Sequence, residues 1–427
     1  MIDFYHCFAE VSDMEKYDVI VVGAGFGGPV AAKKCAEAGL HTLIVERGQR
    51  PGEKVVSGTY VPLFGAPEWI REGNPPLERA AYGWRYHFIK GGDIYLSIDV
   101  SFPFPISHGM YCRPMCTWLA EQAVKAGAEL RTSTTAVDVV KDKDFVKGIV
   151  TDEGEELRCD ILINSEGLQN LLAIKAGIRK KYIPDAIELC LEYDFEMDSA
   201  DIDRIFDNRI EFHFAMPEEK VIAPLGQGSV VYLFPYGNSL HTCIGQFLKH
   251  DGEVAQTSKL LEEYYENYFQ TKRWKEVIGP KAKLRAKMWD TCPLYVGLFP
   301  EMHSMPRCGN GILLIGDAAG FEDTSSGAGI ANAWYSADIA ADVAIEALKA
   351  KDTSAAFLAK YDELWQAHPV LPRSISDRGR RNLLQAQKDE ATMVKLGFEQ
   401  WFNSVYDLIP MLNEMKPSEI KAMLPKV

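Results

Sequence analysis

The pattern that most constrains this chain is a strand, a glycine-rich turn, a helix and a second strand near its N-terminus. Residues 17–22 form an apolar run rich in β-branched residues, which is typical of a buried parallel strand. Gly23-Ala24-Gly25-Phe26-Gly27-Gly28 follows at once, with glycines at the first, third and sixth positions of the GxGxxG pattern. Residues 29–39 are rich in alanine and begin with proline, which predicts a helix. Residues 41–45 predict a second strand that ends at Glu46.

Each part of this unit has a physical role in binding a dinucleotide. Gly23 permits a tight turn, Gly25 lets the backbone approach a pyrophosphate, and Gly28 allows the helix to pack closely on the strand. The unpaired amides and the positive end of the helix dipole stabilise the anion. Glu46 can accept hydrogen bonds from both hydroxyls of an adenosine ribose. The spacing therefore predicts a dinucleotide site rather than a glycine-rich turn of an ordinary α/β protein.

Length, charge and cysteine content exclude several classes of protein. The 427 residues suffice for two or three domains, and the 47% apolar content is that of a globular protein. The net charge of −14, without a basic run, argues against a nucleic-acid partner. No apolar run reaches the roughly 18 residues of a transmembrane segment, and residues 1–15 lack the basic start of a secretory signal. We therefore expect a cytoplasmic protein. The nine cysteines follow no ligand pattern, so we expect free thiols and no metal or iron–sulfur site.

The composition changes near residue 187, where long β-patterned stretches begin. Strands are predicted for the segments 187–197, 210–215, 228–235 and 239–247, followed by a helix at 257–268. We expect a second domain built on an antiparallel sheet with helices on one face.

An earlier aromatic segment, residues 82–89, alternates like a half-buried strand. We expect it to close the substrate site on the side opposite residues 232–235.

A parallel-type strand returns at residues 311–315, after the chain re-enters the first domain near Lys281. Gly316-Asp317-Ala318-Ala319-Gly320 follows this strand. A loop then leads to Gly327-Ala328-Gly329 and to a long alanine-rich helix that ends near Lys351.

Taken in order, four features resemble FAD-dependent oxidoreductases of the p-hydroxybenzoate-hydroxylase fold. They are the glycine-rich unit ending in Glu46-Arg47, Arg113 at a helix start, the strand end at residues 164–167, and Gly316-Asp317. More narrowly, the chain resembles the geranylgeranyl reductases, FixC proteins and electron-transfer-flavoprotein:quinone oxidoreductases. The runs that carry this narrower resemblance are Glu46-Arg47-Gly48, Pro51-Gly52-Glu53-Lys54, Ser57-Gly58, Pro76-Leu77-Glu78-Arg79, Gly316-Asp317-Ala318-Ala319-Gly320 and Gly327-Ala328-Gly329.

The resemblance covers about residues 17–350 and implies an α/β fold. A Rossmann-like FAD-binding domain would carry an inserted antiparallel-sheet substrate domain and a helical C-terminus. The expected divisions are an extension at 1–16, the FAD-binding domain at 17–60, 107–180 and 281–350, the substrate domain at 61–106 and 181–280, and the C-terminal helical region at 351–427.

FAD is the cofactor that the resemblance implies. The turn would hold its pyrophosphate, Glu46 its adenosine ribose, and Asp317 its ribityl and phosphate region. The helix start at residues 327–330 would lie under the flavin, where unpaired amides favour the anionic reduced form. The expected cofactor-binding residues are Gly23, Ala24, Gly25, Phe26, Gly27, Gly28, Glu46, Arg47, Lys54, Ser57, Gly58, Arg113, Ala136, Val137, Gly316, Asp317, Gly327, Ala328, Gly329 and Ile330.

Two departures from the geranylgeranyl reductases bear on the substrate. Ser57-Gly58 stands where they often have Cys-Gly, and Phe234-Pro235-Tyr236 stands where they have Phe-Pro-Lys. Tyr236 is therefore the residue that we expect to contact substrate. No catalytic acid or base is assigned, because the histidines are scattered and a lone histidine is more often structural.

Two enzyme functions stay open, and a non-catalytic nucleotide-binding protein is disfavoured by the intact cofactor pattern. The first is a reductase or dehydrogenase that acts on a C=C or C–C bond of an apolar or CoA-like substrate. It would exchange electrons with an electron-transfer flavoprotein, a ferredoxin or a quinone. The second is an NAD(P)H- and O2-dependent monooxygenase of an aromatic or polyketide substrate. We favour the first, because the motif details fit it better. No second strand–GxGxxG–helix unit for NAD(P)H occurs, so we expect the electrons to be exchanged with a separate partner.

Overall fold

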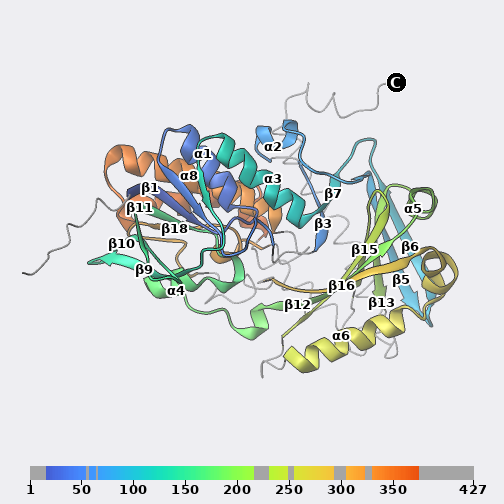
Figure 1. Ribbon diagram of the computed structural model, residues 1–427. Coiled ribbons are helices and arrows are strands. Elements are labelled where there is room, and N and C mark those ends of the chain that lie inside the picture. Colours follow the sequence, from blue (N-terminus) through green and yellow to red (C-terminus); the bar gives the residue numbers. More distant parts are fainter. Residues whose placement is uncertain are drawn as a thin grey trace, which may run out of the picture.

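The computed structural model describes residues 16–53, 57–63, 66–215, 230–248, 254–292, 304–322 and 329–374. Two large sheets lie side by side in these ranges, and a small sheet is located between them (Figure 1). The first large sheet has the parallel core expected for the cofactor side of the chain, and the second has the antiparallel character expected for the substrate side.

The first sheet has eight strands within the described ranges, and its main path runs β17-β18-β11-β1-β2-β8. β1 is parallel to both β2 and β11. Val19, Ile20 and Val21 of β1 are fully buried, as a parallel strand covered on both faces should be. The strands are β1 (Lys16–Val22), β2 (Thr42–Val45), β8 (Glu129–Arg131), β9 (Ala136–Asp142), β10 (Phe145–Thr151), β11 (Glu156–Asn164), β17 (Cys308–Gly309) and β18 (Ile312–Leu314).

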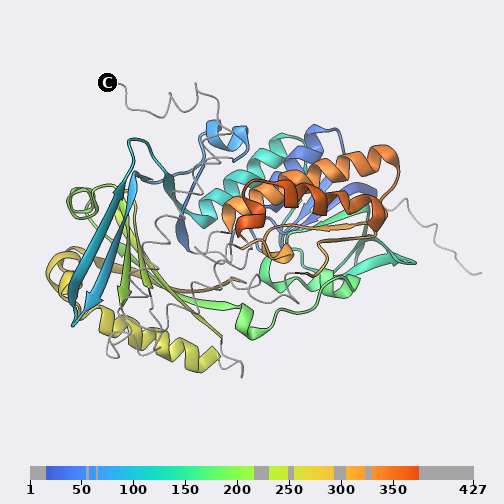
Figure 2. The ribbon, with the colours of Figure 1, turned by 180° about the vertical axis from the view of Figure 1, so that it is seen from behind.

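Three helices pack together against the first sheet: α1 (Gly28–Glu37), α3 (Cys112–Lys125) and α8 (Ile330–Ala350) (Figure 1). α8 buries many alanines, which allow close approach of its neighbours. Figure 2 shows, in orange to red, the last described helices beside α8. They are α9 (Ala355–Leu358), α10 (Lys360–Ala367) and α11 (Leu371–Ser374).

The second sheet has seven strands in the described part of the chain, in the order β16-β12-β15-β14-β13-β5-β6. One face packs on α6 (Val254–Tyr268) and α5 (Ser199–Phe206) through a core that includes Leu191, Leu233 and Ile244. The strands are β5 (Gly83–Lys90), β6 (Asp93–Ser101), β12 (Glu188–Glu196), β13 (Arg209–Ala215), β14 (Val230–Pro235), β15 (Ser239–Phe247) and β16 (Lys283–Cys292).

Two expectations about this sheet are wrong. β5 does not close the opposite side of a substrate site, because it pairs with β13 in the same sheet as β14. The β5–β13 pair is parallel, whereas the other strand pairs of this sheet in the described ranges are antiparallel as expected. β16 pairs with β12, although the chain was expected to return to the cofactor side at residue 281. Strand β16 is at an edge and has exposed alternating residues, so its sequence lacks the apolar signature of a core strand. The domain boundaries themselves stay a prediction.

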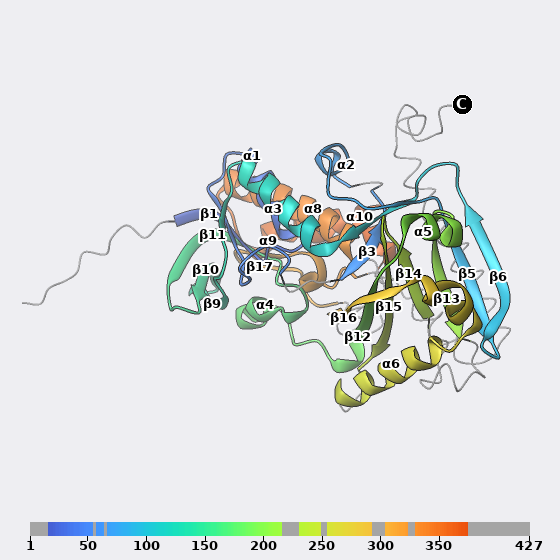
Figure 3. The same cartoon turned by 45° about the vertical axis from the view of Figure 1, so that its right-hand side comes forward.

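The small sheet joins β3 (Gly58–Val61), β7 (Ser107–Tyr111) and β4 (Ala80–Ala81), and Figure 3 shows β3 beside the second sheet. None of the helices in the described ranges is long and apolar enough to span a bilayer. The remaining short helices are α2 (Glu68–Glu72), α4 (Leu171–Ala176), η1 (Gly167–Gln169), η2 (Pro184–Ala186), η3 (Trp274–Ile278), η4 (Gly279–Lys281) and η6 (Gly316–Ala319).

Candidate active site

The glycine-rich turn connects β1 to α1, and its three pattern glycines have different physical roles. Gly23 has φ +102°, and a β-carbon there would lie 2.3 Å from the carbonyl oxygen of Ser165. A β-carbon on Gly28 would lie 1.9 Å from the carbonyl oxygen of Gly23, so the helix packs directly on the turn. A β-carbon on Gly25 would meet nothing within 4 Å. The turn is therefore closed at Gly23 and Gly28 and open at Gly25, where a pyrophosphate was expected.

Glu46 directly follows β2 and spans the open side of the turn. Its Oε2 accepts a hydrogen bond from the Ala24 amide at 2.8 Å, and its Oε1 accepts one from the Gly48 amide at 2.8 Å. The Glu46 carbonyl accepts from the Thr134 amide at 3.0 Å. Because Ala136 and Val137 begin β9 two residues further on, the expected adenine-side strand lies next to Glu46.

The loop after Glu46 packs on the start of α3. Arg113 donates from Nη2 to the Glu53 carbonyl at 2.9 Å, and a β-carbon on Gly52 would lie 3.1 Å from the Arg113 Cα. The Arg113 Nε is buried and has no hydrogen-bond partner in the described part of the chain. Arg47 is exposed and donates to Gln169 at 2.6 Å. Lys54, Gly327 and Ala328, three of the expected cofactor residues, lie outside the described residues.

Gly316 and Asp317 follow β18 in the short helix η6, beside the start of α8. Gly316 has φ +58°, and its amide donates to the Ser336 hydroxyl at 3.0 Å. Gly329 caps the N-terminal end of α8, which begins at Ile330. A β-carbon on Gly27 would lie 3.2 Å from the Ala333 carbonyl oxygen, so the glycine-rich turn touches α8. The structure thus brings the first and last cofactor motifs together.

Sequence reasoning missed a group that supports the Asp317 backbone. The Tyr182 hydroxyl donates to the Asp317 carbonyl at 2.6 Å and accepts from Arg179 Nη2 at 3.0 Å. Both side chains are buried, and burial raises the pKa of Tyr182. No motif could have identified them, because they are single residues between elements.

Tyr236, the expected substrate contact, is fully buried between the small sheet and the second sheet. Its ring lies 5.9 Å from that of Tyr60 and 4.9 Å from that of Tyr111. A β-carbon on Gly58 would lie 2.5 Å from the Tyr236 hydroxyl oxygen, and one on Gly109 would meet the ring at 2.7 Å. Burial raises the pKa of Tyr236 well above its ordinary value, so its hydroxyl stays protonated.

Polar contacts join the small sheet to the second sheet. Ser57 lies directly before β3, and its hydroxyl donates to Asp290 Oδ2 at 3.3 Å. The Tyr111 hydroxyl lies 2.6 Å from the Ser239 hydroxyl and donates to Asp194 Oδ1 at 3.3 Å. Asp194, Ser239 and Asp290 therefore mark the face of the second sheet that is turned toward the expected FAD-binding segments. We call this the cofactor-facing face.

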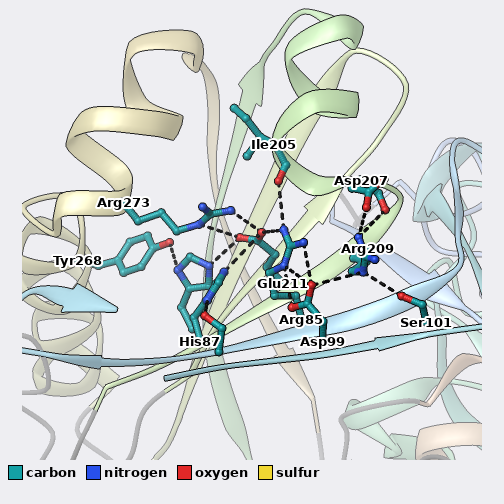
Figure 4. A network of polar contacts seen from close by, with 12 residues as sticks. Arg85, His87, Asp99, Ser101, Ile205, Asp207, Arg209, Glu211, Tyr268 and Arg273 are labelled. Atoms are coloured by element: carbon teal, nitrogen blue, oxygen red, sulfur yellow. Dashed lines mark hydrogen bonds and ion pairs between the residues drawn. The ribbon is translucent and has the colours of Figure 1, made fainter. Parts of the chain in front are cut away.

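The opposite face contains a second polar network, centred on Glu211 of β13 (Figure 4). Glu211 is paired across strands with Leu233, whose side chain belongs to the core beneath α6. Its carboxylate accepts from Arg85 Nη1 at 3.0 Å, from Arg273 Nε at 3.1 Å and from His213 Nε2 at 2.9 Å. This network therefore fastens the segment after α6 to the sheet and lies away from the expected flavin site.

His87, Glu211 and His213 are close enough to share a metal ion. Two guanidinium groups already neutralise the Glu211 carboxylate, and their charge opposes a bound cation. Burial would raise the pKa of Glu211, but hydrogen bonds from His213 and His87 and the charge of Arg273 hold it well below its ordinary value. Burial lowers the pKa of His213 to about 4, against the attraction of Glu211. We assign the group as a charge network rather than a metal site.

Comparisons with known proteins agree with this geometry. A family model described as FAD dependent oxidoreductase matches residues 18–182. The chain is 30% identical to digeranylgeranylglycerophospholipid reductase 2 of Methanococcoides burtonii, over 83% of this chain and 80% of that protein. It is 29% identical to the digeranylgeranylglycerophospholipid reductase of Methanocaldococcus jannaschii, over 84% of this chain and 83% of that one.

Solved structures share the fold at lower identity. A geranylgeranyl bacteriochlorophyll reductase-like protein from Thermoplasma acidophilum has a TM-score of 0.67 and 22% identity, and covers 93% of this chain and 100% of its own. The flavin-dependent brominase Bmp2 has a TM-score of 0.60 and 16% identity, and covers 91% of this chain and 100% of its own.

The fold, the open glycine-rich turn and these matches define an FAD-dependent oxidoreductase. Within that class, the chain belongs to the geranylgeranyl (digeranylgeranylglycerophospholipid) reductase family, one of the groups that its sequence resembled. The residues present fit the cofactor, because the turn is open at Gly25 and the buried Arg113 Nε is a donor without a hydrogen-bond partner in the described ranges. The roles of the individual residues in binding FAD stay predictions.

Proposed function

We propose that this protein reduces C=C bonds in the isoprenoid chains of a glycerophospholipid. The relatives at 29–30% identity carry digeranylgeranylglycerophospholipid reductase as their name, and that name describes such a substrate. FAD, when bound, supplies the hydride, and the chain binds and orients the lipid against it.

The observation that carries the proposal is a continuous row of aromatic rings on the cofactor-facing face. Cross-strand pairing places the rings together, and successive centroids lie 5.3, 6.1, 5.0, 5.4 and 5.9 Å apart. The last ring lies 5.8 Å from Tyr60 of the small sheet. We call this the aromatic row, and in order its members are Phe88, Phe214, Tyr86, Phe212, Tyr232 and Phe234.

The aromatic row suits an extended apolar chain. It crosses β5, β13 and β14, and Leu96 and Ile98 continue the apolar surface onto β6. Four strands at about 4.8 Å spacing give a path of roughly 15 Å. An isoprenoid chain laid along this path would gain apolar burial at about 25 cal/mol per Å².

We propose further that the electrons come from a separate redox protein or a quinone. The sequence has no second strand–GxGxxG–helix unit for a nicotinamide cofactor, and Gly309-Asn310-Gly311 lies between the antiparallel strands β17 and β18. An acidic chain of net charge −14 suits a partner with a basic docking surface.

The test is an anaerobic turnover experiment with the FAD-loaded protein. Dithionite-reduced protein is mixed with di-O-geranylgeranylglyceryl phosphate in detergent, and the lipid is analysed by mass spectrometry. We expect a gain of two hydrogens for each double bond reduced, and none with the oxidised protein. Unchanged lipid, together with NADPH-driven oxygen uptake on an aromatic compound, would support the monooxygenase instead.

A further inference from the structure

A buried contact between a histidine and a glutamate lies at the end of the aromatic row. Glu192 on β12 and His241 on β15 are 6% and 0% exposed, and His241 Nε2 lies 3.2 Å from Glu192 Oε2. The strands are hydrogen-bonded neighbours, and the cross-strand partner of His241 is Asp194. Because Asp194 contacts Tyr111 of the small sheet, both members of the pair are on the cofactor-facing face.

Two aromatic rings hold the His241 imidazole in place. Its centroid lies 6.3 Å from that of Phe234 and 6.2 Å from that of Tyr236, with interplanar angles of 7° and 17°. Phe234 is the last member of the aromatic row, and Tyr236 packs against Gly58. The imidazole therefore stands between the proposed lipid path and the Ser57-Gly58 segment.

Several polar atoms of this group are buried without a hydrogen bond in the part of the chain that the structure describes. They are Nδ1 and Nε2 of His241, Oε2 of Glu192 and the hydroxyl of Tyr236. The Glu192 and His241 side chains are thus in contact but not aligned for a hydrogen bond. Buried polar groups are satisfied in most proteins, and exceptions mark functional positions or unfilled ligand sites.

The Glu211 network contains a second buried histidine–glutamate contact in the same sheet, but its hydrogen bonding differs. Both ring nitrogens of His213 are bonded there, to Glu211 at 2.9 Å and to the Tyr268 hydroxyl at 2.8 Å. Both hydrogen-bonding positions of the His213 ring are therefore occupied by protein groups. The ring nitrogens of His241 have no hydrogen-bond partners in the described ranges, and this ring faces the proposed substrate path.

We propose that His241, paired with Glu192, is the proton donor in the reduction of the lipid double bond; this role rests on the proposed function. Saturating a C=C bond requires a hydride on one carbon and a proton on the other. Bound FAD would supply the hydride, which leaves the proton to be delivered by a side chain beside the substrate path.

In this step, a protonated ring nitrogen of His241 gives its proton to one alkene carbon. The π electron pair forms the new C–H bond, and the other carbon, now electron-poor, accepts the hydride. Both electrons of the reduction arrive with the hydride, and neutral His241 recovers its proton from solvent. The Glu192 carboxylate stabilises the imidazolium before transfer, and the aromatic row stabilises the developing positive charge. Phe234 and Tyr236 act as positioning residues for the imidazole.

The test follows flavin reoxidation by stopped flow, using dithionite-reduced holoprotein and di-O-geranylgeranylglyceryl phosphate. His241→Asn should slow reoxidation by about 10²–10⁴-fold, the usual contribution of a general acid. Wild type should show a solvent deuterium isotope effect on the reoxidation rate, and the variant should lose it. FAD content and reduction by dithionite should be unchanged, which distinguishes a lost proton donor from a damaged fold.

Glu192→Gln is the second variant, because it keeps the size of the side chain while removing the charge that holds the imidazolium. It should also slow reoxidation. The matched controls are His41→Asn and Glu129→Gln, which alter an exposed histidine–glutamate pair with an Nε2–Oε1 distance of 2.8 Å on the first sheet. Neither control should change the rate.

The outcomes separate the two proposals. If wild type is reoxidised and His241→Asn matches it in rate and isotope effect, the proton-donor role is wrong. If the lipid fails to reoxidise wild type, the proposed function is wrong and the role falls with it.

Discussion

The carboxylate of Glu46 accepts a hydrogen bond from the backbone amide of Ala24 at 2.8 Å. This contact ties the end of β2 to the glycine-rich turn that follows β1. The same carboxylate holds the Gly48 amide, so the turn and the following loop share one anchor. A ribose that binds Glu46 is thereby fixed relative to a pyrophosphate at Gly25.

Glu46→Ala should weaken FAD binding. Hydrogen bonds to a charged acceptor contribute about 1.5–3 kcal/mol, which corresponds to a roughly ten- to hundredfold increase in Kd. Titration of the FAD-free protein, followed by flavin fluorescence, measures this directly. Glu129→Gln, at an exposed site on the same sheet, should leave the Kd unchanged. Equal Kd values for FAD in wild type and Glu46→Ala would show that Glu46 does not bind the ribose.

Gly25→Ala and Gly28→Ala should differ in a diagnostic way. An added methyl at Gly25 meets nothing within 4 Å, so the FAD-free protein should keep its stability while FAD binding is lost. An added methyl at Gly28 would lie 1.9 Å from the Gly23 carbonyl, so stability should fall by about 1–3 kcal/mol or more, with or without FAD. Urea unfolding of both variants, with and without FAD, measures the free energy of unfolding and thereby tests both expectations. Tight FAD binding by Gly25→Ala would contradict a pyrophosphate at that position.

The free energy of unfolding should fall as the pH drops from about 6.5 toward 4, because the pKa of His213 is lowered from 6.5 to about 4. In that range the unfolded chain binds a proton that folded His213 excludes, so the stabilisation present above pH 6.5 is lost on acidification. The contribution is on the order of 2–3 kcal/mol. Urea unfolding at several pH values measures it.

His213→Asn is the control for this pH dependence. It should be less stable at pH 7, because Glu211 and Tyr268 each lose a partner, but its stability should change less between pH 6.5 and 4. A variant whose profile runs parallel to wild type would show that another group titrates.

Anaerobic NADH or NADPH at millimolar concentration should leave the flavin oxidised for minutes, whereas dithionite should bleach it at once. The reason is the lack of a second dinucleotide-binding unit in the sequence. Absorbance spectroscopy follows both reactions. Rapid bleaching by either nucleotide, faster still with an aromatic compound, would favour monooxygenase chemistry.

Local sequence signals predicted the cofactor side of the fold well. A β-carbon on Gly28 would meet the Gly23 carbonyl, a contact that is local in the sequence, so the pattern and the structure agree there. Gly23 approaches Ser165, which is distant in the sequence, and Gly25 is open. The FAD cofactor and the enzyme family were also predicted from motifs and are confirmed.

The second sheet was harder to predict, because its pairings join distant segments. Nothing in residues 83–90 identifies β13 as their neighbour, and β16 lacks an apolar signature. The functional role proposed for His241 could not be predicted from the sequence for a related reason. Folding brings Glu192 and Tyr236 beside His241, and the spacing of these residues in the sequence does not predict their contact. The role of Tyr236 as a substrate contact stays a prediction.

The parallel pairing of β5 with β13 has a consequence for synthesis. The β5–β6 hairpin is synthesised before β13, so Gly83 cannot pair with Arg209 until the chain has been extended to that residue. Strands β8 to β11 of the first sheet are synthesised in between. The first sheet is incomplete until β18 pairs with β11, and β18 is synthesised after β16. All described strands of the second sheet are therefore synthesised before the first sheet can be completed, and pairings over such distances form slowly. Until β13 is synthesised, Tyr86 and Phe88 lack their stacking partners Phe212 and Phe214. A nascent chain stalled before residue 209 would therefore expose the aromatic rings of the β5–β6 hairpin, and such exposed apolar surface favours aggregation.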